Sequence, residues 1–414
     1  MRIVHVVTAF PRAEEDVITP WMVEMIARLR DRGHEAEVLA PAYRGSPSHA
    51  VRGIPVRRFR YAPAACETLT HEETAPDRVR RSPAHAALVP LYAVAGVAAG
   101  WRTGRRREPA VVHAHWPVPH ALFGAAARAG SGGRAALVCS FYAVEVNWVR
   151  RRLRWLRPLL RWSARTADAV TAISSSTARS VEEASGREPR VVPFAAAVDE
   201  EVPAASLREP LSGDGPLRIL FVGRLVERKG VEVLVRALPR ILEHRDAELT
   251  VVGEGPRAES IRRTARRAGV ADRVSLTGFL SREELSRRYA GCDIFVLPAV
   301  VDRKGDTEGL GVVLLEALRR ARPVVASEVG GIPDIVRDGR TGWLVPAGDE
   351  EALARRVLEL CRQPERARRV AREGRAFAEE RFGWDRVLDD LETVYEEARR
   401  RRRAAGAGAG EGAA

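Results

Sequence analysis

Residues 305–317 place glycines, two carboxylates and an apolar run in one short segment, Gly-Asp-Thr-Glu-Gly-Leu-Gly-Val-Val-Leu-Leu-Glu-Ala. Glycines that lead directly into an apolar-periodic helix leave backbone N–H groups free to bind a phosphate, and the helix dipole strengthens the attraction. Glu308 lies before the predicted helix, and Glu316 lies in its second turn. The segment predicts a binding site for a phosphorylated ligand. The alternative is a polar helix entry without a ligand.

A second cluster, Phe-Val-Gly-Arg-Leu-Val-Glu-Arg-Lys-Gly at residues 221–230, follows a predicted strand. Gly223 allows close backbone approach where the strand meets the loop. Arg224 and Lys229 can hold the two phosphates of a diphosphate by charge-assisted hydrogen bonds. A solvated basic loop is the alternative, although Lys229 and Lys304 are the only lysines in the chain.

The first half of the chain alternates apolar strand-like runs with helical segments, the pattern of a parallel sheet with helices on both faces. Its first helix is predicted from Pro20 to Arg32, with Thr19 as the cap and Gly33 at the end. The predicted strands are Arg2–Val7, Ala36–Ala40, Val51–Phe59, Ala110–His115, Ala135–Ser140, Ala169–Ile173 and Arg190–Pro193.

A second alternating series begins after residues 203–216, which are rich in Pro, Ser, Gly and charge and lack periodicity. We expect an N-terminal domain over 1–205, a linker over 206–216, and a C-terminal domain over 217–383. A helix over 384–403 is expected to pack back on the N-terminal domain, with a disordered Gly/Ala tail over 404–414. The second series has predicted strands Leu217–Val222, Glu248–Val252, Val274–Leu276, Ile294–Leu297, Pro323–Ala326 and Gly342–Val345.

Composition bounds the class of protein. The length of 414 residues and a hydrophobic content of 45% predict two domains with a core each. The four cysteines, Cys66, Cys139, Cys292 and Cys361, have neither CxxC pairs nor histidines at zinc spacing. This pattern indicates no disulfide framework and no metal knuckle, and it favours a reducing compartment.

A net charge of +13 favours an anionic partner, which composition alone does not identify. A basic nucleic-acid-binding protein is one alternative, but we expect no nucleic acid because the basic residues do not interleave with an aromatic stacking platform. A nicotinamide-dependent enzyme is another. The first strand is not followed by G-x-G-x-x-G, which argues against it.

Two segments bear on location. The start of the chain runs from a few apolar residues into Pro11 and an acidic stretch, unlike a secretory signal, so we expect a cytoplasmic protein. The longest uncharged stretch, Ala84 to Trp101, approaches membrane-span length, but it contains Pro90, Gly96 and Gly100. We expect a buried or interfacial helix there.

These motifs together resemble the retaining glycosyltransferases of the GT-B fold, specifically family 4. The first segment is similar to the family's E-x7-E signature, and Gly223 to Gly230 is similar to its GRL-x3-KG diphosphate loop. Further matches are the GxGP turn at 253–256, Leu-Thr-Gly-Phe-Leu at 276–280, Gly-Gly-Ile-Pro-Asp at 330–334 and Asp-Gly-Arg-Thr-Gly at 338–342. The resemblance covers nearly the whole C-terminal half. It implies two facing Rossmann-like domains with a cleft between them.

The resemblance also implies an activity, the transfer of a sugar from a nucleoside-diphosphate sugar to an acceptor hydroxyl, in glycan, exopolysaccharide or glycolipid biosynthesis. Arg224 and Lys229 would neutralise the diphosphate, Glu308 would contact the transferred sugar and Glu316 would hold the ribose. No Asp-x-Asp pair is present, and such enzymes use these cations and the helix dipole, so no metal or other cofactor is expected. The donor-binding residues implied are Gly223, Arg224, Lys229, Gly253, Phe279, Leu280, Glu308, Gly309, Leu310, Gly311 and Glu316.

The N-terminal half resembles the acceptor domain of the family less closely. The acceptor would be a carbohydrate, a lipid-linked sugar or a small molecule. Tyr142 stands where many relatives have a histidine that touches the donor sugar, and tyrosine is no base near neutral pH. His115 and Glu145 are further candidates on the acceptor or sugar side, while His113 is more typical of a satisfied strand residue.

Residues 148–165 carry alternating tryptophans and arginines. At 100° per residue, Trp148, Trp155 and Trp162 gather on one side of a helix, and Arg150, Arg154, Arg157, Arg161 and Arg165 gather on the other. One interpretation is a helix that lies on an anionic membrane and makes the protein peripheral to the inner face of the cell membrane. The other is a helix that packs its apolar face on the N-terminal sheet. Pro158 predicts a kink or break in either case.

Overall fold

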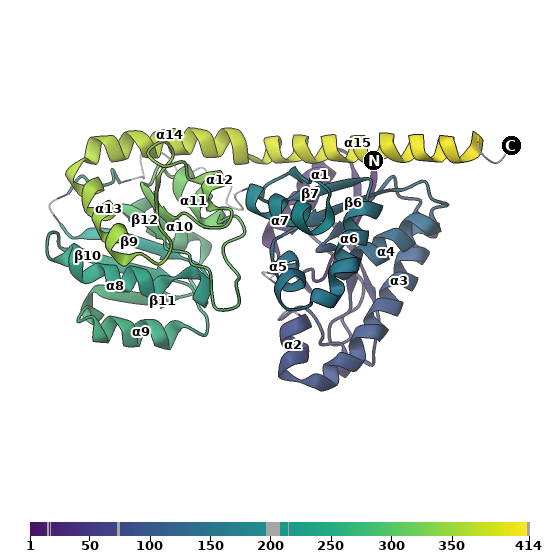
Figure 1. Cartoon of the computed structure of the whole chain (residues 1–414), viewed down its shortest axis with the longest axis horizontal. Coiled ribbons are helices and arrows are strands. Elements are labelled where there is room, and N and C mark those ends of the chain that lie inside the picture. The colour runs from purple at the N-terminus through teal and green to yellow at the C-terminus, as the bar shows by residue number, and fades with distance from the viewer. Residues whose placement is uncertain (15, 17, 73–74, 196–207, 214, 412–414) are drawn as a thin grey trace. The chain divides into compact units, whose positions relative to one another are not determined.

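The computed structural model describes the chain except residues 15, 17, 73–74, 196–207, 214 and 412–414 (Figure 1). It divides into two compact units, one formed by residues 1–192 with 387–414 and the other by residues 193–386. We describe each unit by itself and call them unit 1 and unit 2. Most of the linker expected over 206–216 is described, but residues 206, 207 and 214 lie outside the described part of the chain.

Unit 1 contains one sheet with strand order β3-β4-β2-β1-β5-β6-β7-β8. Neighbouring strands are parallel except β3, which runs antiparallel to β4. The order reverses between β1 and β5, so the carboxyl ends of these two strands form a switch point, where open parallel sheets usually bind ligands. The strands are β1 (Arg2–Val6), β2 (Glu35–Pro41), β3 (His49–Val51), β4 (Ile54–Phe59), β5 (Val111–His115), β6 (Ala136–Phe141), β7 (Ala169–Ala172) and β8 (Arg190–Val191).

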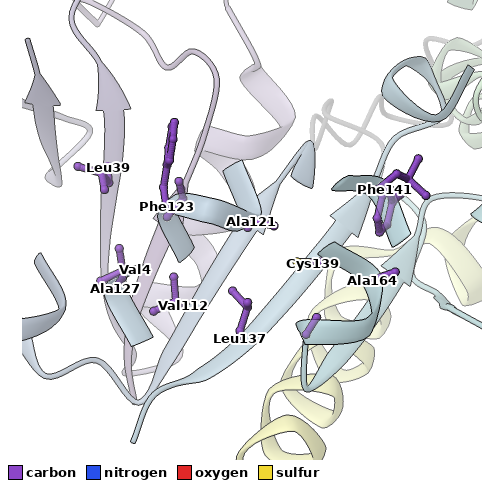
Figure 2. Close-up of a cluster of buried hydrophobic side chains, with 14 of the residues drawn as sticks. Val4, Leu39, Val112, Ala121, Phe123, Ala127, Leu137, Cys139, Phe141 and Ala164 are labelled. Atoms are coloured by element: carbon purple, nitrogen blue, oxygen red, sulfur yellow. The ribbon is translucent and has the colours of Figure 1, made fainter. Parts of the chain in front are cut away.

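Helices cover this sheet, and long apolar runs in the strands are buried beneath them. Val4, Val112 and Leu137 from three neighbouring strands pack with Phe123 of α4 in a continuous apolar cluster (Figure 2). The helices of unit 1 are α1 (Pro20–Asp31), α2 (Ala75–Arg81), α3 (Leu88–Arg107), α4 (Pro117–Gly130), α5 (Val144–Arg151), α6 (Arg157–Thr166), α7 (Ser175–Ser185) and α15 (Trp384–Glu411), with short 3-10 turns η1 (Ala64–Cys66), η2 (Pro83–Ala87) and η3 (Arg154–Leu156).

Unit 2 contains a fully parallel sheet of order β11-β10-β9-β12-β13-β14. Numbered within the unit this is 3-2-1-4-5-6, the Rossmann order, and its switch point lies between β9 and β12. The strands are β9 (Leu217–Val222), β10 (Ala247–Val252), β11 (Val274–Gly278), β12 (Ile294–Leu297), β13 (Val324–Ser327) and β14 (Trp343–Val345). The helices are α8 (Val231–Leu242), α9 (Ala258–Arg267), α10 (Arg282–Gly291), α11 (Val312–Arg319), α12 (Ile332–Ile335), α13 (Glu350–Arg362) and α14 (Pro364–Phe382), with turns η5 (Glu227–Lys229) and η6 (Ala271–Arg273).

The predicted α/β class with two Rossmann-like sheets is confirmed, and three local expectations are corrected. Val51–Phe59 is not one strand, because Arg52 and Gly53 adopt positive φ angles of 47° and 74° and turn the chain back from β3 into β4. Thr19 does not cap α1, since its own φ is 48° and its side chain accepts no capping bond. The last helix continues through Glu411, past the expected tail start at residue 404.

Candidate functional site

The loops that follow β9, β10 and β11 meet backbone to backbone at the carboxyl edge of the unit 2 sheet. Gly223 donates its N–H to Val252, and Gly253 donates its N–H to Gly278, at 3.0 and 2.9 Å. Gly253 has a φ of 122°, and a Cβ there would lie 2.2 Å from the Gly223 carbonyl oxygen. Glycine is therefore required, and it holds the loop that carries Arg224. Arg224 is exposed, and no ion pair is found for it among the described residues.

Lys229 and Glu308 come from loops that follow β9 and β12, the two strands at the switch point. Lys229 ends the η5 turn, and its Nζ donates a short hydrogen bond to Glu308 Oε2. Both side chains are buried. Burial alone raises the pKa of Glu308, but Lys229, Arg228 and the Gly309 N–H outweigh it, and the pKa lies below its ordinary value. The sequence predicted both residues but not their direct contact.

The backbone of Glu308 is fixed by the two glycines at 330 and 331. Gly331 donates its N–H to the Glu308 carbonyl at 3.0 Å. Gly330 has a φ of 60°, and a Cβ there would lie 2.0 Å from the same carbonyl oxygen. Any side chain at Gly330 would displace Glu308, so this glycine pair positions the carboxylate.

The predicted phosphate-binding helix entry is α11, whose N-cap Gly311 has a φ of 91° and whose N-terminus has no side-chain cap. Leu310 is buried and anchors the loop before it. The Gly309 N–H contributes to the lowered pKa of the Glu308 carboxylate. The amides at the start of α11 keep the favourable end of the helix dipole.

Glu316 lies in the second turn of α11 and accepts a hydrogen bond from the Tyr289 hydroxyl at 2.8 Å. Burial raises the pKa of Glu316. Tyr289 comes from α10, and sequence reasoning missed it because its spacing from Glu316 carries no signal. Phe279 and Leu280 follow β11, and the Phe279 ring is 75% exposed, which leaves it open to stacking.

The candidate residues in unit 1 meet at the switch point of its own sheet. His115 ends β5, and its Nδ1 shares a hydrogen bond of 2.5 Å with the Tyr142 hydroxyl. The Tyr142 ring packs beside Trp21 and Trp116, with ring centroids 5.4 and 4.8 Å away. Burial raises the pKa of Tyr142 well above its ordinary value, so its hydroxyl stays protonated.

Glu145 lies in the first turn of α5, and its Oε1 accepts a hydrogen bond of 2.8 Å from the Tyr142 N–H. Its Oε2 is buried and has no hydrogen-bond partner among the described residues. Burial raises the pKa of Glu145 to about 7. A carboxyl group with this pKa and one unpaired oxygen can exchange a proton near neutral pH.

His5, His113 and His115 form a buried cluster whose possible ligand atoms lie within 4.8 Å of one another. His5 Nδ1 and His115 Nε2 share a hydrogen bond of 3.0 Å. His113 forms hydrogen bonds with the hydroxyls of Ser140 and Tyr395, at 2.6 and 2.8 Å. Burial lowers the pKa of all three, so they are neutral. Sequence reasoning missed His5, although β1 places it in register with His113. The cluster is a hydrogen-bonded network that supports His115.

The single helix considered over residues 148–165 is wrong. The segment breaks at Arg152 and Leu153, and it is divided among α5, η3 and α6. Three of the five arginines expected to face lipid instead contact α7: Arg150 binds Ser180 and Glu183, Arg161 donates to the Ala184 carbonyl, and Arg165 donates to the Ser185 carbonyl. Arg157 donates to the Arg150 carbonyl of α5, and Arg154 is exposed. Trp155 remains 74% exposed.

The two sheets and the loops at their switch points define the architecture of the GT-B glycosyltransferases, and comparison with solved structures agrees. The structure of Anabaena HepE in complex with UDP and glucose superposes with a TM-score of 0.69 at 20% identity, covering 95% of this chain and 99% of that one. Sucrose-phosphate synthase from Thermosynechococcus elongatus gives 0.71 at 19% identity, covering 96% and 98%.

Family models match both halves: "Glycosyltransferase Family 4" over residues 21–201 and "Glycosyl transferases group 1" over residues 216–363. A curated relative is the GDP-mannose-dependent alpha-(1-6)-phosphatidylinositol monomannoside mannosyltransferase of Mycolicibacterium smegmatis, 36% identical over 64% of this chain and 71% of that protein. The amylovoran biosynthesis glycosyltransferase AmsK of Erwinia amylovora is 41% identical over 35% of this chain and 36% of its own length. The chain belongs to the group 1 glycosyltransferases of family 4.

Proposed function

We propose that this glycosyltransferase moves a sugar, with retention of anomeric configuration, from a nucleoside-diphosphate sugar to an acceptor hydroxyl in glycan, exopolysaccharide or glycolipid biosynthesis. The observation that carries the proposal is the buried Lys229–Glu308 pair at the switch point of unit 2, beside the N-terminus of α11. A cation for phosphate and a carboxylate for the sugar lie in direct contact there, where a glycosyl phosphate bond could bridge them.

The donor is held by unit 2. Arg224 and Lys229 bind the diphosphate, with support from the N-terminus of α11. Glu316 accepts hydrogen bonds from the ribose hydroxyls, and the exposed ring of Phe279 stacks on the base with Leu280 beside it. In this structure the Tyr289 hydroxyl donates a hydrogen bond to Glu316. The ribose hydroxyls therefore bind the Glu316 carboxylate either beside the tyrosine hydroxyl or in its place.

The chemistry follows from these charges. The bond between the anomeric carbon and the diphosphate oxygen breaks, and its electron pair leaves with the phosphate, which Arg224 and Lys229 stabilise. The carboxylate of Glu308 stabilises the positive charge that develops on the sugar. The acceptor oxygen bonds to the anomeric carbon on the face that the phosphate leaves, and its proton passes to the departing phosphate oxygen. The configuration is thereby retained.

Leaving-group stabilisation by Arg224, Lys229 and α11 supports a reaction without a metal ion. Guanidinium and ammonium groups supply the positive charge that Mg²⁺ provides in other phosphate sites. We therefore propose that the enzyme needs neither a metal nor another cofactor. EDTA is expected to leave activity unchanged, and activity that disappears with EDTA and returns with Mg²⁺ or Mn²⁺ contradicts the proposal.

The first donor to test is GDP-mannose, because the mannosyltransferases similar to this chain over about two thirds of its length use it. Their acceptors are phosphatidylinositol mannosides, which supports a lipid-linked or polysaccharide acceptor here. In unit 1, the groups that face the acceptor or sugar are His115, Tyr142 and Glu145. We propose that the activity is cytoplasmic.

A donor screen tests this proposal. UDP-, GDP- and ADP-sugars are compared by thermal shift and by slow hydrolysis in EDTA, first with wild type and then with Lys229→Ala. Nucleotide sugars with one of the three bases are expected to stabilise the wild-type protein. Lys229→Ala is expected to lower the affinity for that donor at least about tenfold, because a charged contact with the phosphate is lost. No stabilisation by any nucleotide sugar contradicts the proposal.

A further inference from the structure

Helix α3 has an apolar face that stays exposed in unit 1. The segment Pro83–Arg107 is the one described stretch that is long and apolar enough to cross a membrane, yet only 22% of its most apolar window is buried. In a chain with 30% charged residues, no Asp, Glu, Lys or Arg occurs between Arg81 and Arg102. The exposed large side chains of this helix are Val89, Leu91, Val94, Val97 and Trp101.

The inward face of α3 is already fully used by α4, which lies beside it along the edge of unit 1 (Figure 1). Gly96, Gly100 and Gly104 face α4, and a Cβ at Gly100 or Gly104 would lie 2.3 or 1.8 Å from a carbonyl oxygen of that helix. This close packing keeps α3 on the surface of the unit, so it lies along a surface instead of crossing a bilayer. The outward apolar residues remain exposed in the unit, Leu91 at 52% and Val94 at 70%.

Arginines border this apolar face at both ends. Arg80 precedes it and is exposed, and Arg102, Arg105 and Arg106 follow it and are exposed. The Arg105 guanidinium lies 5.4 Å from the centre of the Trp101 ring. No ion pair is found for Arg80, Arg102 or Arg106 among the described residues. An apolar strip with tryptophan at its boundary and arginines beyond it matches the layers of an anionic membrane surface, where acyl chains give way to phosphates.

We propose that unit 1 docks on an anionic phospholipid bilayer through α3, with Leu91, Val94 and Trp101 entering the interface and Arg102, Arg105 and Arg106 binding lipid phosphates. This surface replaces the one expected over 148–165, where the single helix is broken and Arg150, Arg161 and Arg165 contact α7. The proposal does not depend on the acceptor being a lipid, because it concerns binding and not transfer. It brings the active enzyme to a membrane even with a soluble acceptor.

Vesicle sedimentation tests the proposal on the full-length protein. The vesicles are phosphatidylglycerol with phosphatidylcholine in equal amounts, or phosphatidylcholine alone. Wild type is expected to bind the anionic vesicles at least tenfold more tightly, with binding that weakens as salt rises. The double variant Leu91→Glu/Val94→Glu is expected to lose at least tenfold in affinity, and the triple variant Arg102→Gln/Arg105→Gln/Arg106→Gln to lose most of the salt dependence. All substituted side chains are exposed, and circular dichroism checks that the variants fold.

The matched control is Trp155→Gln/Trp162→Gln, which replaces the exposed tryptophans of the surface formed by residues 148–165. It is expected to bind like wild type. Loss of vesicle binding in this control, with unchanged binding in the α3 variants, overturns the proposal. So does a wild-type protein that ignores anionic vesicles at low salt. Sedimentation velocity without lipid provides the last outcome, since a dimer that Leu91→Glu/Val94→Glu dissolves, with no vesicle binding, assigns the face to a second copy of the chain instead.

Discussion

Glu308 and Lys229 neutralise each other in a buried position, and this pairing decides what each substitution should do. Glu308→Gln keeps the shape of the side chain but removes its charge, so the developing positive charge on the sugar loses its stabilisation. We expect the turnover number to fall by about two orders of magnitude or more, with little change in donor affinity. Steady-state kinetics and nucleotide titration measure the two effects separately.

The matched control for that substitution is Glu350→Gln, which removes a half-exposed carboxylate paired with Arg236 on the surface of unit 2. It should leave turnover unchanged. A Glu308→Gln enzyme with near wild-type turnover contradicts the assigned role of the carboxylate. A Glu308→Gln enzyme that loses donor binding instead assigns it to ground-state recognition.

Glu145 gives a prediction about pH, because burial raises its pKa from 4.5 to about 7. The folded state then binds this proton more tightly than the unfolded state, so stability falls as pH rises from the unfolded pKa through the folded one. The loss is on the order of 3 kcal/mol, for a shift of between two and three pKa units. Glu145→Gln should remove this pH-dependent loss of stability. The melting temperature of the variant, relative to that of wild type, should therefore rise between pH 4.5 and 8.

The exposed variant Glu182→Gln on α7 is the control, and its melting temperature should follow wild type across the same range. If the melting temperatures of Glu145→Gln and wild type changed in parallel with pH, folding would not raise the pKa of the Glu145 carboxyl, which would then be ionised at neutral pH. Such a result removes the basis for proton exchange by Glu145 near the Tyr142 backbone.

The residues of the donor site could be predicted because each belongs to a short motif with a chemical reason. Their partners could not. Tyr289 reaches Glu316 from α10, and Gly331 anchors the Glu308 backbone from the loop after β13, and both contacts depend on how the sheet is ordered. The roles assigned to Arg224, Phe279 and the other donor residues stay predictions.

The positions of the strands followed directly from apolar runs in the sequence. The bounds of β9 and β12 agree with the sequence prediction, since buried parallel strands are continuously apolar and end at turn residues. Errors arose where a local backbone angle decides the outcome. The Arg52-Gly53 turn divides a run that is apolar on both sides, and the break at Arg152 and Leu153 interrupts a helical pattern without a glycine.

The packing of α3 on α4 allows a test with opposite signs at two glycines. Replacing a helical glycine by alanine usually stabilises a protein by about 0.5–1 kcal/mol. At Gly104 the new Cβ would lie 1.8 Å from the Ala127 carbonyl oxygen, so Gly104→Ala should instead destabilise the protein by about 1–3 kcal/mol. Gly291 is the last residue of α10, and a Cβ added there would have no neighbouring atom within 4 Å. Gly291→Ala should therefore be neutral or stabilising.

Thermal unfolding of the two variants measures this contrast. Equal and small effects at both positions would mean that α3 can move away from α4 without loss. In that case α4 does not hold α3 in place, and the outward face of α3 is not its only face free to meet a membrane.

The chain returns to unit 1 at its C-terminal end. Residues Leu388, Leu391, Val394, Tyr395 and Ala398 of α15 are buried, and the Tyr395 hydroxyl bonds to His113 at 2.8 Å. Removing residues 387–414 should therefore destabilise unit 1 and abolish transfer, while unit 2 keeps its nucleotide affinity within about threefold, because its sheet and loops are complete. Calorimetric titration with the nucleotide found in the donor screen measures the affinity, and lost nucleotide binding contradicts this division.

The stereochemistry of the product tests the proposed same-face transfer. With an α-linked nucleotide sugar, an acceptor and EDTA, same-face attack supported by Arg224, Lys229 and Glu308 predicts an α-linked product. The NMR coupling constant between protons H1 and H2 of the transferred sugar distinguishes the two anomers. For mannose, the one-bond coupling between C1 and H1 is used instead. An α-linked product formed without metal agrees with the proposed reaction. A β-linked product, or transfer that requires added Mg²⁺ or Mn²⁺, contradicts it.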